Sequence, residues 1–137
     1  MLTATDLEVN VLEFRGRSFQ FERLVEHEGG PYAVFARTET ESERQLRPRL
    51  VHLTLVAPLA WVRHDPLTDG LRVGRGRALP MSGEATPVEV AAEAPEFEED
   101  GVRWQRRAAG TANYLYVPAE RSDALLSPAG RAALGVG

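Results

Sequence analysis

Residues 18–36, SFQFERLVEHEGGPYAVFA, contain the pattern that decides the fold. In the first half, the apolar residues Phe19, Phe21 and Val25 alternate with polar ones, which is the two-residue period of a half-buried strand. The pair Gly29-Gly30 is a strong turn signal, and a second apolar run follows it directly. We therefore expect an antiparallel hairpin in which Phe19, Phe21 and Val25 share one face.

The same alternation recurs before and after this hairpin, and turns that contain glycine or proline separate the runs. Proline is favourable at the first position of a helix, so Ser127-Pro128 predicts a short C-terminal helix. The predicted fold is all-β, an antiparallel meander or a small partly open barrel, with two packed hairpin modules as an alternative. Strands are expected at 7–11, 18–26, 32–36, 50–56, 71–73, 102–106 and 114–117, and the helix at 129–134. The core is expected to contain Phe19, Phe35, Leu53, Trp61 and Trp104.

Two stretches of the chain lack a core pattern of their own. The first, Thr38 to Arg49, is charged and predicts a long exposed connection with at most one helical turn. The second, Gly74 to Pro95, is rich in proline, glycine and alanine, as linkers and irregular loops are. We expect 1–137 to be a single domain with a first β module, a linker or long loop, and a second hairpin module with a C-terminal turn. These three parts are predicted at 1–78, 79–95 and 96–137.

Composition excludes several classes of function. The 137 residues include no cysteine, which excludes disulfides, thiolate nucleophiles and cysteine zinc sites. All 16 basic residues are arginine, and the absence of lysine and isoleucine is typical of a GC-rich bacterial genome, so the arginines are weak grounds for nucleic-acid binding. The net charge of −4 would repel phosphate at long range. The N-terminus lacks a signal-peptide pattern, and no apolar stretch reaches the ~20 residues that span a bilayer, so we expect a cytoplasmic protein without membrane insertion.

Two segments resemble one another. Gly16-Arg17-Ser18-Phe19-Gln20 is similar to Gly101-Val102-Arg103-Trp104-Gln105, because each is a turn glycine followed by an aromatic residue and glutamine. Each segment leads through a further glycine to a strand that contains tyrosine, Tyr32 or Tyr114. Either the chain contains an internal duplication, or both segments follow the chemistry that all tight hairpins share.

The stretch Phe97-Glu98-Glu99-Asp100-Gly101-Val102-Arg103-Trp104, followed by Gly110-Thr111-Ala112 and Tyr114, resembles the bacterial family called domain of unknown function 4178. The resemblance implies paired β modules, with residues 7–36 as the first and 96–117 as the second. It implies an accessory protein encoded near membrane-stress and polyamine-related proteins, and it carries over no catalytic residues. The connection at 38–49 is more charged than the family pattern.

Candidate catalytic and ligand-binding groups are few. His27, His52 and His64 are not spaced as metal ligands on one element, so we expect no metal and no other cofactor. Met81-Ser82-Gly83 lacks the glycines of a nucleophile elbow, and the acids at 96–100 are consecutive, as on a solvated face. The chain is therefore not expected to be an enzyme. Its Gly74-Arg75-Gly76-Arg77 segment is a weak match to RNA-binding Arg-Gly segments, and it fits no phosphate loop.

The preferred function is a non-catalytic protein-interaction or scaffold module that binds a protein partner or itself. The alternatives are a small β barrel that binds single-stranded nucleic acid and a β barrel that binds a small ligand in an apolar pocket. Short strands such as 32–36 and 114–117 are expected to offer a free sheet edge to a partner, the second of them steered by the charges at 96–100 and 103–107. The interaction surface is predicted at Arg103, Arg106, Arg107, Tyr114 and Tyr116.

Overall fold

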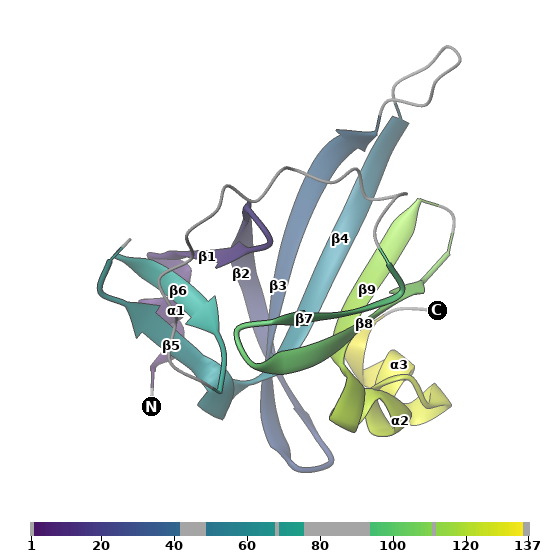
Figure 1. Ribbon diagram of the computed structural model, residues 1–137. Helices are drawn as coiled ribbons and strands as arrows, with labels where there is room; N and C mark the ends of the chain where they lie inside the picture. The colour runs from purple at the N-terminus through teal and green to yellow at the C-terminus, as the bar shows by residue number, and fades with distance from the viewer. Residues whose placement is uncertain (1, 42–48, 68, 76–93, 111, 136–137) are drawn as a thin grey trace.

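The computed structural model describes residues 2–41, 49–67, 69–75, 94–110 and 112–135 (Figure 1). Within these ranges nine strands form one sheet in the order β5-β6-β1-β2-β3-β4-β9-β8-β7, and the sheet curls into a half-barrel. The prediction of an all-β, partly open barrel with a short C-terminal helix is therefore confirmed. The strands are β1 (Val11–Phe14), β2 (Arg17–His27), β3 (Gly30–Glu41), β4 (Arg49–Pro58), β5 (Val62–Asp65), β6 (Gly70–Val73), β7 (Glu96–Glu99), β8 (Val102–Ala108) and β9 (Asn113–Pro118). The helices are α1 (Ala4–Glu8), η1 (Leu59–Trp61), η3 (Ala119–Arg121), α2 (Ser122–Leu125) and α3 (Pro128–Leu134).

The sheet combines a local meander with two long-range parallel contacts. Strands β1 to β4 follow one another as antiparallel neighbours, as the turn signals predict. Strand β6 joins β1 in parallel, and β9 joins β4 in parallel. Two parallel neighbouring strands must be joined by a long crossover connection. They therefore lie far apart in the sequence, and no turn motif between them predicts their pairing. As a result, β9 lies between β4 and β8 in the interior of the sheet.

The two similar segments form similar hairpin turns. In the turn between β1 and β2, Arg15 has φ 51° and Gly16 has φ 75°; between β7 and β8, Asp100 has φ 51° and Gly101 has φ 78°. Positive φ at both central residues is the mark of a type I′ turn, whose twist matches that of the strands it joins. Each turn thus starts a strand whose third residue is a buried aromatic side chain.

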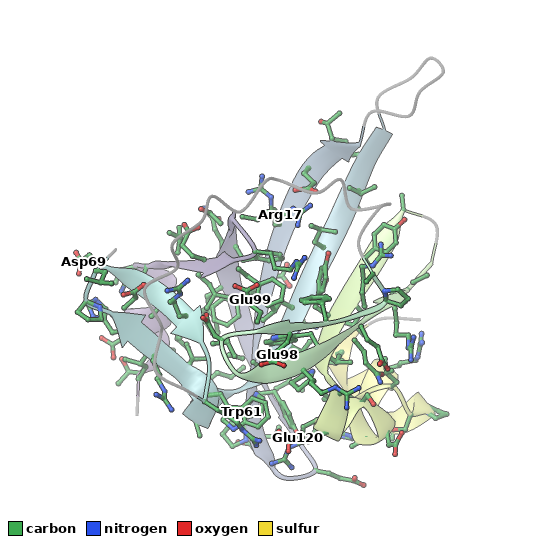
Figure 2. All side chains as sticks on the ribbon, viewed as in Figure 1. Arg17, Trp61, Asp69, Glu98, Glu99 and Glu120 are labelled. Atoms are coloured by element: carbon green, nitrogen blue, oxygen red, sulfur yellow. The ribbon has the colours of Figure 1, made fainter. Side chains whose placement is uncertain are left out.

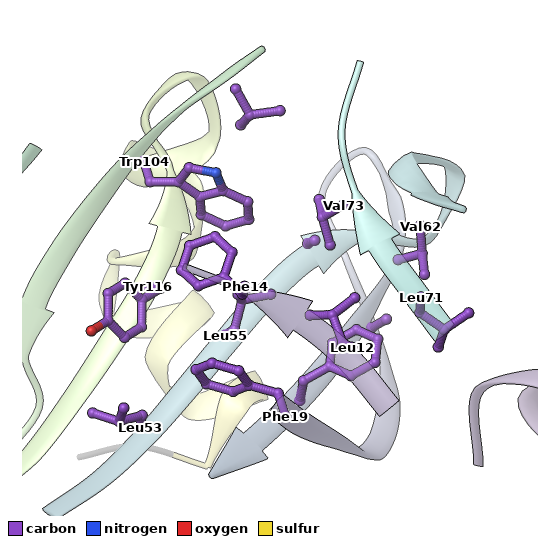
Figure 3. Packing of buried hydrophobic residues seen from close by; sticks show 14 of the residues in the cluster. Leu12, Phe14, Phe19, Leu53, Leu55, Val62, Leu71, Val73, Trp104 and Tyr116 are labelled. Atoms are coloured by element: carbon purple, nitrogen blue, oxygen red, sulfur yellow. The ribbon is translucent and has the colours of Figure 1, made fainter. Parts of the chain in front are cut away.

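The main core lies inside the curl, where the two hairpins meet (Figure 3). The Phe14 ring lies 4.9 Å from the Trp104 ring and 5.5 Å from the Tyr116 ring between centroids, both in edge-to-face geometry. Such aromatic pairs contribute about 0.5–1.5 kcal/mol each beyond the area they bury. Of the residues predicted for the core, Trp61 is only partly buried. The predicted residues with no solvent exposure are Phe19, Phe35, Leu53 and Trp104.

A bulge in β2 changes which face its side chains occupy. The register with β3 shifts between Phe21 and Arg23, so odd-numbered residues lie on opposite faces before and after this point. Phe21 packs against the concave core, whereas Val25 belongs to a second cluster on the convex face. The expectation that Phe19, Phe21 and Val25 share one face is therefore wrong. Arg23 lies beside the convex cluster and donates a hydrogen bond to the Leu134 carbonyl at the end of α3.

Helices α2 and α3 cover the convex cluster. The predicted C-terminal helix is confirmed, with Pro128 in its first turn and the Ser127 side chain accepting a hydrogen bond from the Gly130 N–H. It ends at Gly135, whose φ of 74° favours glycine. One buried cluster therefore lies on each face of the sheet. The buried members of the convex cluster are Val25, Tyr32, Val34, Val56, Leu115, Val117, Leu125 and Leu134.

Two predicted elements differ in the structure. Residues 7–11, expected as a strand, contain the end of α1, because Thr3 and Asp6 form a capping box that begins a helix. Leu7 is buried by this helix, whereas Val9 is 73% exposed. Much of the expected exposed connection at 38–49 is strand, since β3 continues to Glu41 and β4 begins at Arg49. Residues 42–48 of that connection, and 76–93 of the predicted linker, lie outside the described residues.

Polar contacts close the curl by joining the two ends of the sheet. Arg72 of β6 places its Nε 3.3 Å from an oxygen of Asp100 in the β7–β8 turn. The Arg75 N–H donates to the Asp100 carbonyl at 3.2 Å. Arg15 lies 3.8 Å from Glu99 and 4.2 Å above the Phe97 ring. The β7–β8 hairpin is therefore held against the ends of both β1 and β6 (Figure 1).

Candidate functional site

The residues predicted as an interaction surface lie on β8 and β9, on opposite faces of the sheet. Arg103 and Arg107 alternate with Trp104 and Arg106, so Arg103 and Arg107 project from the convex side. Arg106 projects into the curl, where its guanidinium lies 5.0 Å above the Tyr114 ring. The structure therefore does not bring the five residues together on one surface.

Tyr116 is a core residue in this structure, with 1% of its surface exposed. The two outward arginines are engaged by neighbours on their own face, Arg103 with Glu96 at 3.2 Å and Arg107 with Gln105 at 3.2 Å. Tyr114 is half-buried against the core. Only Arg103 and Arg107 are exposed, so the predicted surface is reduced to those two side chains.

The expected free edges at 114–117 and 32–36 are interior strands, so this prediction is wrong. Strand β9 is paired with β4 on one side and with β8 on the other, and β3 is paired with β2 and β4. The sequence shows 32–36 and 114–117 as short apolar runs, and those features do not separate an edge strand from an interior one. The pairing of β9 with β4 comes from far along the chain, so local periodicity does not indicate that β9 is an interior strand.

The inside of the curl is filled by aromatic side chains. Phe14, Phe19, Phe97, Trp104 and Tyr116 contact one another edge to face or tilted, with centroids 4.9 to 6.4 Å apart. Hollows of about 400, 460 and 410 Å³ lie elsewhere, on β2–β3, between β8 and η3, and beside α2. The lining of each hollow mixes charged or polar side chains with apolar ones, whereas the ligand-binding alternative requires a predominantly apolar pocket.

The three histidines lie apart from one another, and each has a polar contact with a different residue of the chain. His27 Nε2 is 3.2 Å from the Ala124 carbonyl oxygen, His52 Nδ1 is 3.1 Å from the Thr38 hydroxyl, and His64 Nε2 is 3.0 Å from an Asp69 oxygen. No group of three or more metal-binding side chains occurs in the part of the chain that the structure describes. The serine of Met81-Ser82-Gly83 lies outside that part.

The arginine of the Gly74-Arg75-Gly76-Arg77 segment that the structure describes is bound by its own chain. The Arg75 guanidinium lies 4.0 Å above the Trp61 ring and 2.6 Å from an oxygen of Glu120. Figure 2 shows Trp61 and Glu120 at the same end of the molecule. Arg75 thus ties η1 to η3, and Arg77 lies outside the described residues.

The described sheet ends in two short edge strands of different character. Strand β7 has Glu96, Glu98 and Glu99 in its four residues, and such charges on an edge oppose pairing with other strands. Arg15 also contacts this strand, 3.8 Å from Glu99 and 4.2 Å above the Phe97 ring. Strand β5 has the single exposed cation Arg63. The less protected edge of the sheet is therefore β5.

The outer side of β5 presents unpaired backbone groups. The Gly74 N–H donates to the Trp61 carbonyl, so in the antiparallel register Trp61, Arg63 and Asp65 point their backbone groups toward β6. Val62 and His64 point theirs outward. The Val62 N–H is taken by the Leu59 carbonyl. The Val62 carbonyl and both backbone groups of His64 have no partner among the described residues.

Exposed apolar side chains lie around the β5–β6 hairpin. Leu67 in the turn of this hairpin is 84% exposed. Val11, at the start of the neighbouring strand β1, is 40% exposed, and Val9 just before it is the side chain already described as exposed. These three are among the five large apolar residues that are most exposed in the described ranges. Of these three, Leu67 lies in the hairpin that contains the open edge, whereas β6 separates Val11 from that edge.

Asp6 is a charged group near this edge. The Thr3 backbone N–H and then the Thr3 hydroxyl donate hydrogen bonds to its carboxylate, which lowers the pKa of Asp6 from its usual value. His64 contributes a smaller electrostatic effect in the same direction. Helix α1 and β5 are therefore close enough for their charges to interact.

No known protein family, curated protein or solved structure that we compared matches this chain. The resemblance to domain of unknown function 4178 therefore stays a prediction. Among the described helices, none combines the length and the apolar character needed to cross a bilayer.

Proposed function

We propose that this chain is a non-catalytic protein-interaction module that binds an extended segment of a partner along the outer side of β5. The observation that carries the proposal is that the Val62 carbonyl and both backbone groups of His64 have no partner among the described residues. An added strand would satisfy these groups, and main-chain hydrogen bonds are the source of affinity in this binding mode. The exposed side chain of Leu67, which follows β5 in the turn to β6, would extend the contact beyond the strand.

The alternatives have less support among the described residues. Binding of single strands requires a basic groove with stacking platforms, and here arginines such as Arg17, Arg37 and Arg75 lie within 3.1 Å of carboxylates. A ligand barrel requires an apolar interior space, and aromatic rings occupy the interior. A scaffold module requires neither a basic groove nor an apolar interior space.

The test is site-specific photo-crosslinking of the full chain in its source cells. A photoreactive phenylalanine at Leu67 should yield discrete adducts with another protein, whereas the same group at Glu98, on the other edge, should not. His64→Pro should remove the adducts, because proline has no N–H to donate outward. His64→Ala is the matched control, since it keeps the N–H and should keep the adducts. Adducts of equal yield from both edges, or adducts that survive His64→Pro, would contradict the proposal.

A further inference from the structure

Arg63 is one of two exposed side chains on β5, and it has no ion-pair partner among the described residues. Arg63 lies directly opposite Arg72 in the register with β6, and like charges in this position repel. Arg72 is compensated by Asp65 at 3.5 Å and Asp100 at 3.3 Å. No described residue compensates Arg63 in that way. Within the described residues, the edge strand thus carries a positive charge without a counter-charge, on the face opposite the core.

A strand added to β5 would place a side chain against Arg63. Hydrogen bonds to Val62 and His64 make Arg63 part of the intervening non-hydrogen-bonded pair, in which facing side chains are closest. A carboxylate there would compensate Arg63 and reduce its repulsion with Arg72. Opposite charges across a strand pair are favourable, and this pair lies at the centre of the four-residue edge.

A second copy of β5 fits this edge poorly. If two copies pair Val62 with His64, the Arg63 side chains of both copies lie opposite one another. If they pair His64 with His64, Val62 lies opposite Pro66, which has no N–H to donate to the Val62 carbonyl. If they pair Val62 with Val62, His64 lies opposite Ala60, which is in the helical turn η1 and not in an extended strand. Each of these antiparallel registers therefore carries a penalty that a different strand does not.

We infer that the partner segment is an extended strand of another protein with Asp or Glu opposite Arg63. This inference rests on the proposed function of β5 and adds the chemistry of the partner. The acidic residue sets the register of the added strand, while the backbone of Val62 and His64 holds it. Arg63 and Pro66 together disfavour pairing between copies of the chain, which leaves the edge open to the acidic strand.

The probe is a phage-displayed library of random decapeptides, selected on the immobilised full chain. Peptides that bind the wild type should share an Asp or Glu at one position among β-branched residues. Selection on Arg63→Glu should enrich Lys or Arg at that position instead. A selected peptide, made synthetically, should bind Arg63→Gln about two- to fivefold more weakly than the wild type. The same peptide with its acid changed to Lys should prefer Arg63→Glu over the wild type.

Two controls separate failure of the inference from failure of the proposed function. His64→Pro should abolish peptide binding and His64→Ala should retain it, with circular dichroism to show that both variants fold. Peptides that need the His64 N–H but show no acidic preference would overturn the inference and leave the edge function standing. Peptides indifferent to His64→Pro, or a library that yields no binders, would overturn both.

Sedimentation equilibrium of the wild type and His64→Pro tests a second copy as the occupant. The strand β7, with Glu96 and Glu98, is an acidic strand that a second copy would bring. We expect a monomer at the concentrations used for the peptides. Self-association that His64→Pro removes would identify a second copy as the occupant and overturn the assignment to another protein.

Discussion

The β1–β2 and β7–β8 hairpins have nearly the same local design and different places in the sheet. Both turn through a left-handed residue and a glycine, and both bury an aromatic side chain three residues after that glycine. Strand β1 gains a second neighbour in β6, whereas β7 ends the sheet. Local sequence thus determines the shape of each hairpin, and long-range pairing determines whether its first strand is interior or exposed.

The two hairpins are also complementary where they meet. The first contributes Phe14 and Arg15, and the second contributes Phe97, Glu99 and Trp104. The aromatic rings bury the contact, and the ion pair borders it at 26% side-chain exposure on each partner. We therefore expect substitutions of the buried rings to lower the stability most, substitutions of the turn glycines to lower it less, and loss of the ion pair to lower it least of the three.

The largest effects are expected for the buried aromatic residue of each hairpin. Phe19→Ala and Trp104→Ala should each lower the free energy of unfolding by about 3–5 kcal/mol, because each leaves a cavity in the core. Chemical denaturation measures this change. Trp104→Phe should cost less than half as much, since the Trp104 Nε1 has no hydrogen-bond partner among the described residues. Losses below about 1 kcal/mol at both positions would show that the hairpins do not share a core.

Changes in the turn glycines test whether the hairpins are alike. Gly16→Ala should cost about 1–2 kcal/mol, from backbone strain alone, because nothing lies within 4 Å of the added methyl group. Gly101→Ala should cost a similar amount, since its φ differs from that of Gly16 by only 3° (78° against 75°). Thermal denaturation of both variants gives the comparison. A difference of more than about 2 kcal/mol would mean that long-range contacts dominate one of the turns.

A smaller effect is expected for the ion pair between the hairpins. Arg15→Ala removes the contact with Glu99 and the stacking on Phe97, which at partly exposed sites contribute about 0.5–1 kcal/mol each at most. The cost should fall when salt is raised, because the charges reach solvent. Arg103→Ala, on the exposed face of β8, is the matched control and should stay within about 0.5 kcal/mol of the wild type. Equal costs for the two arginines would remove the special role of Arg15.

The smallest effect on stability is expected for Asp6, which lies in α1 and outside both hairpins. The pKa of Asp6 is lowered by its hydrogen bonds from Thr3, so its contribution to stability is fully present above the usual Asp value. That contribution is lost as the pH falls through the lowered pKa. Asp6→Asn should therefore be slightly less stable than the wild type at pH 7, and the difference should shrink as the pH falls below the usual Asp value. A stability difference that stays unchanged over that fall in pH would exclude the carboxylate as its source.

Local sequence patterns predict most of the strands and little of their arrangement. The alternation at 18–26 and 50–56 and the glycine turns depend on neighbouring residues, so they can be read directly. The bulge after Phe21 has no glycine or other mark, and it reverses the face of Val25. At the N-terminus, the alternation of Leu7, Val9 and Val11 suggests a strand, although Thr3 and Asp6 already have the spacing of a helix cap.

The sequence predicts the candidate site less well than the fold, because whether a strand lies at the edge of a sheet depends on its pairing with segments far along the chain. The sequence indicates part of β5 at Trp61-Val62-Arg63 and part of β6 at 71–73. Nothing in them indicates that β6 pairs with β1 and leaves β5 outside. The arginines and tyrosines of β8 and β9 are predicted as an interaction surface on the expectation that 114–117 is a free sheet edge, and β9 is an interior strand. Here Tyr116 serves the core instead.

The parallel pairing of β4 with β9 has a consequence for folding during synthesis. His52 pairs with Asn113, so the ribosome must make the residues between them before β4 gains its second neighbour. Until then, the meander of β1 to β4 ends in an open strand whose convex face also lacks α2 and α3. Closing so long a loop is slow compared with forming the hairpins. The nascent chain therefore passes through a stage in which one side of β4 is open and its apolar side chains on the convex face are exposed, and a chaperone that binds extended apolar segments would act at that stage.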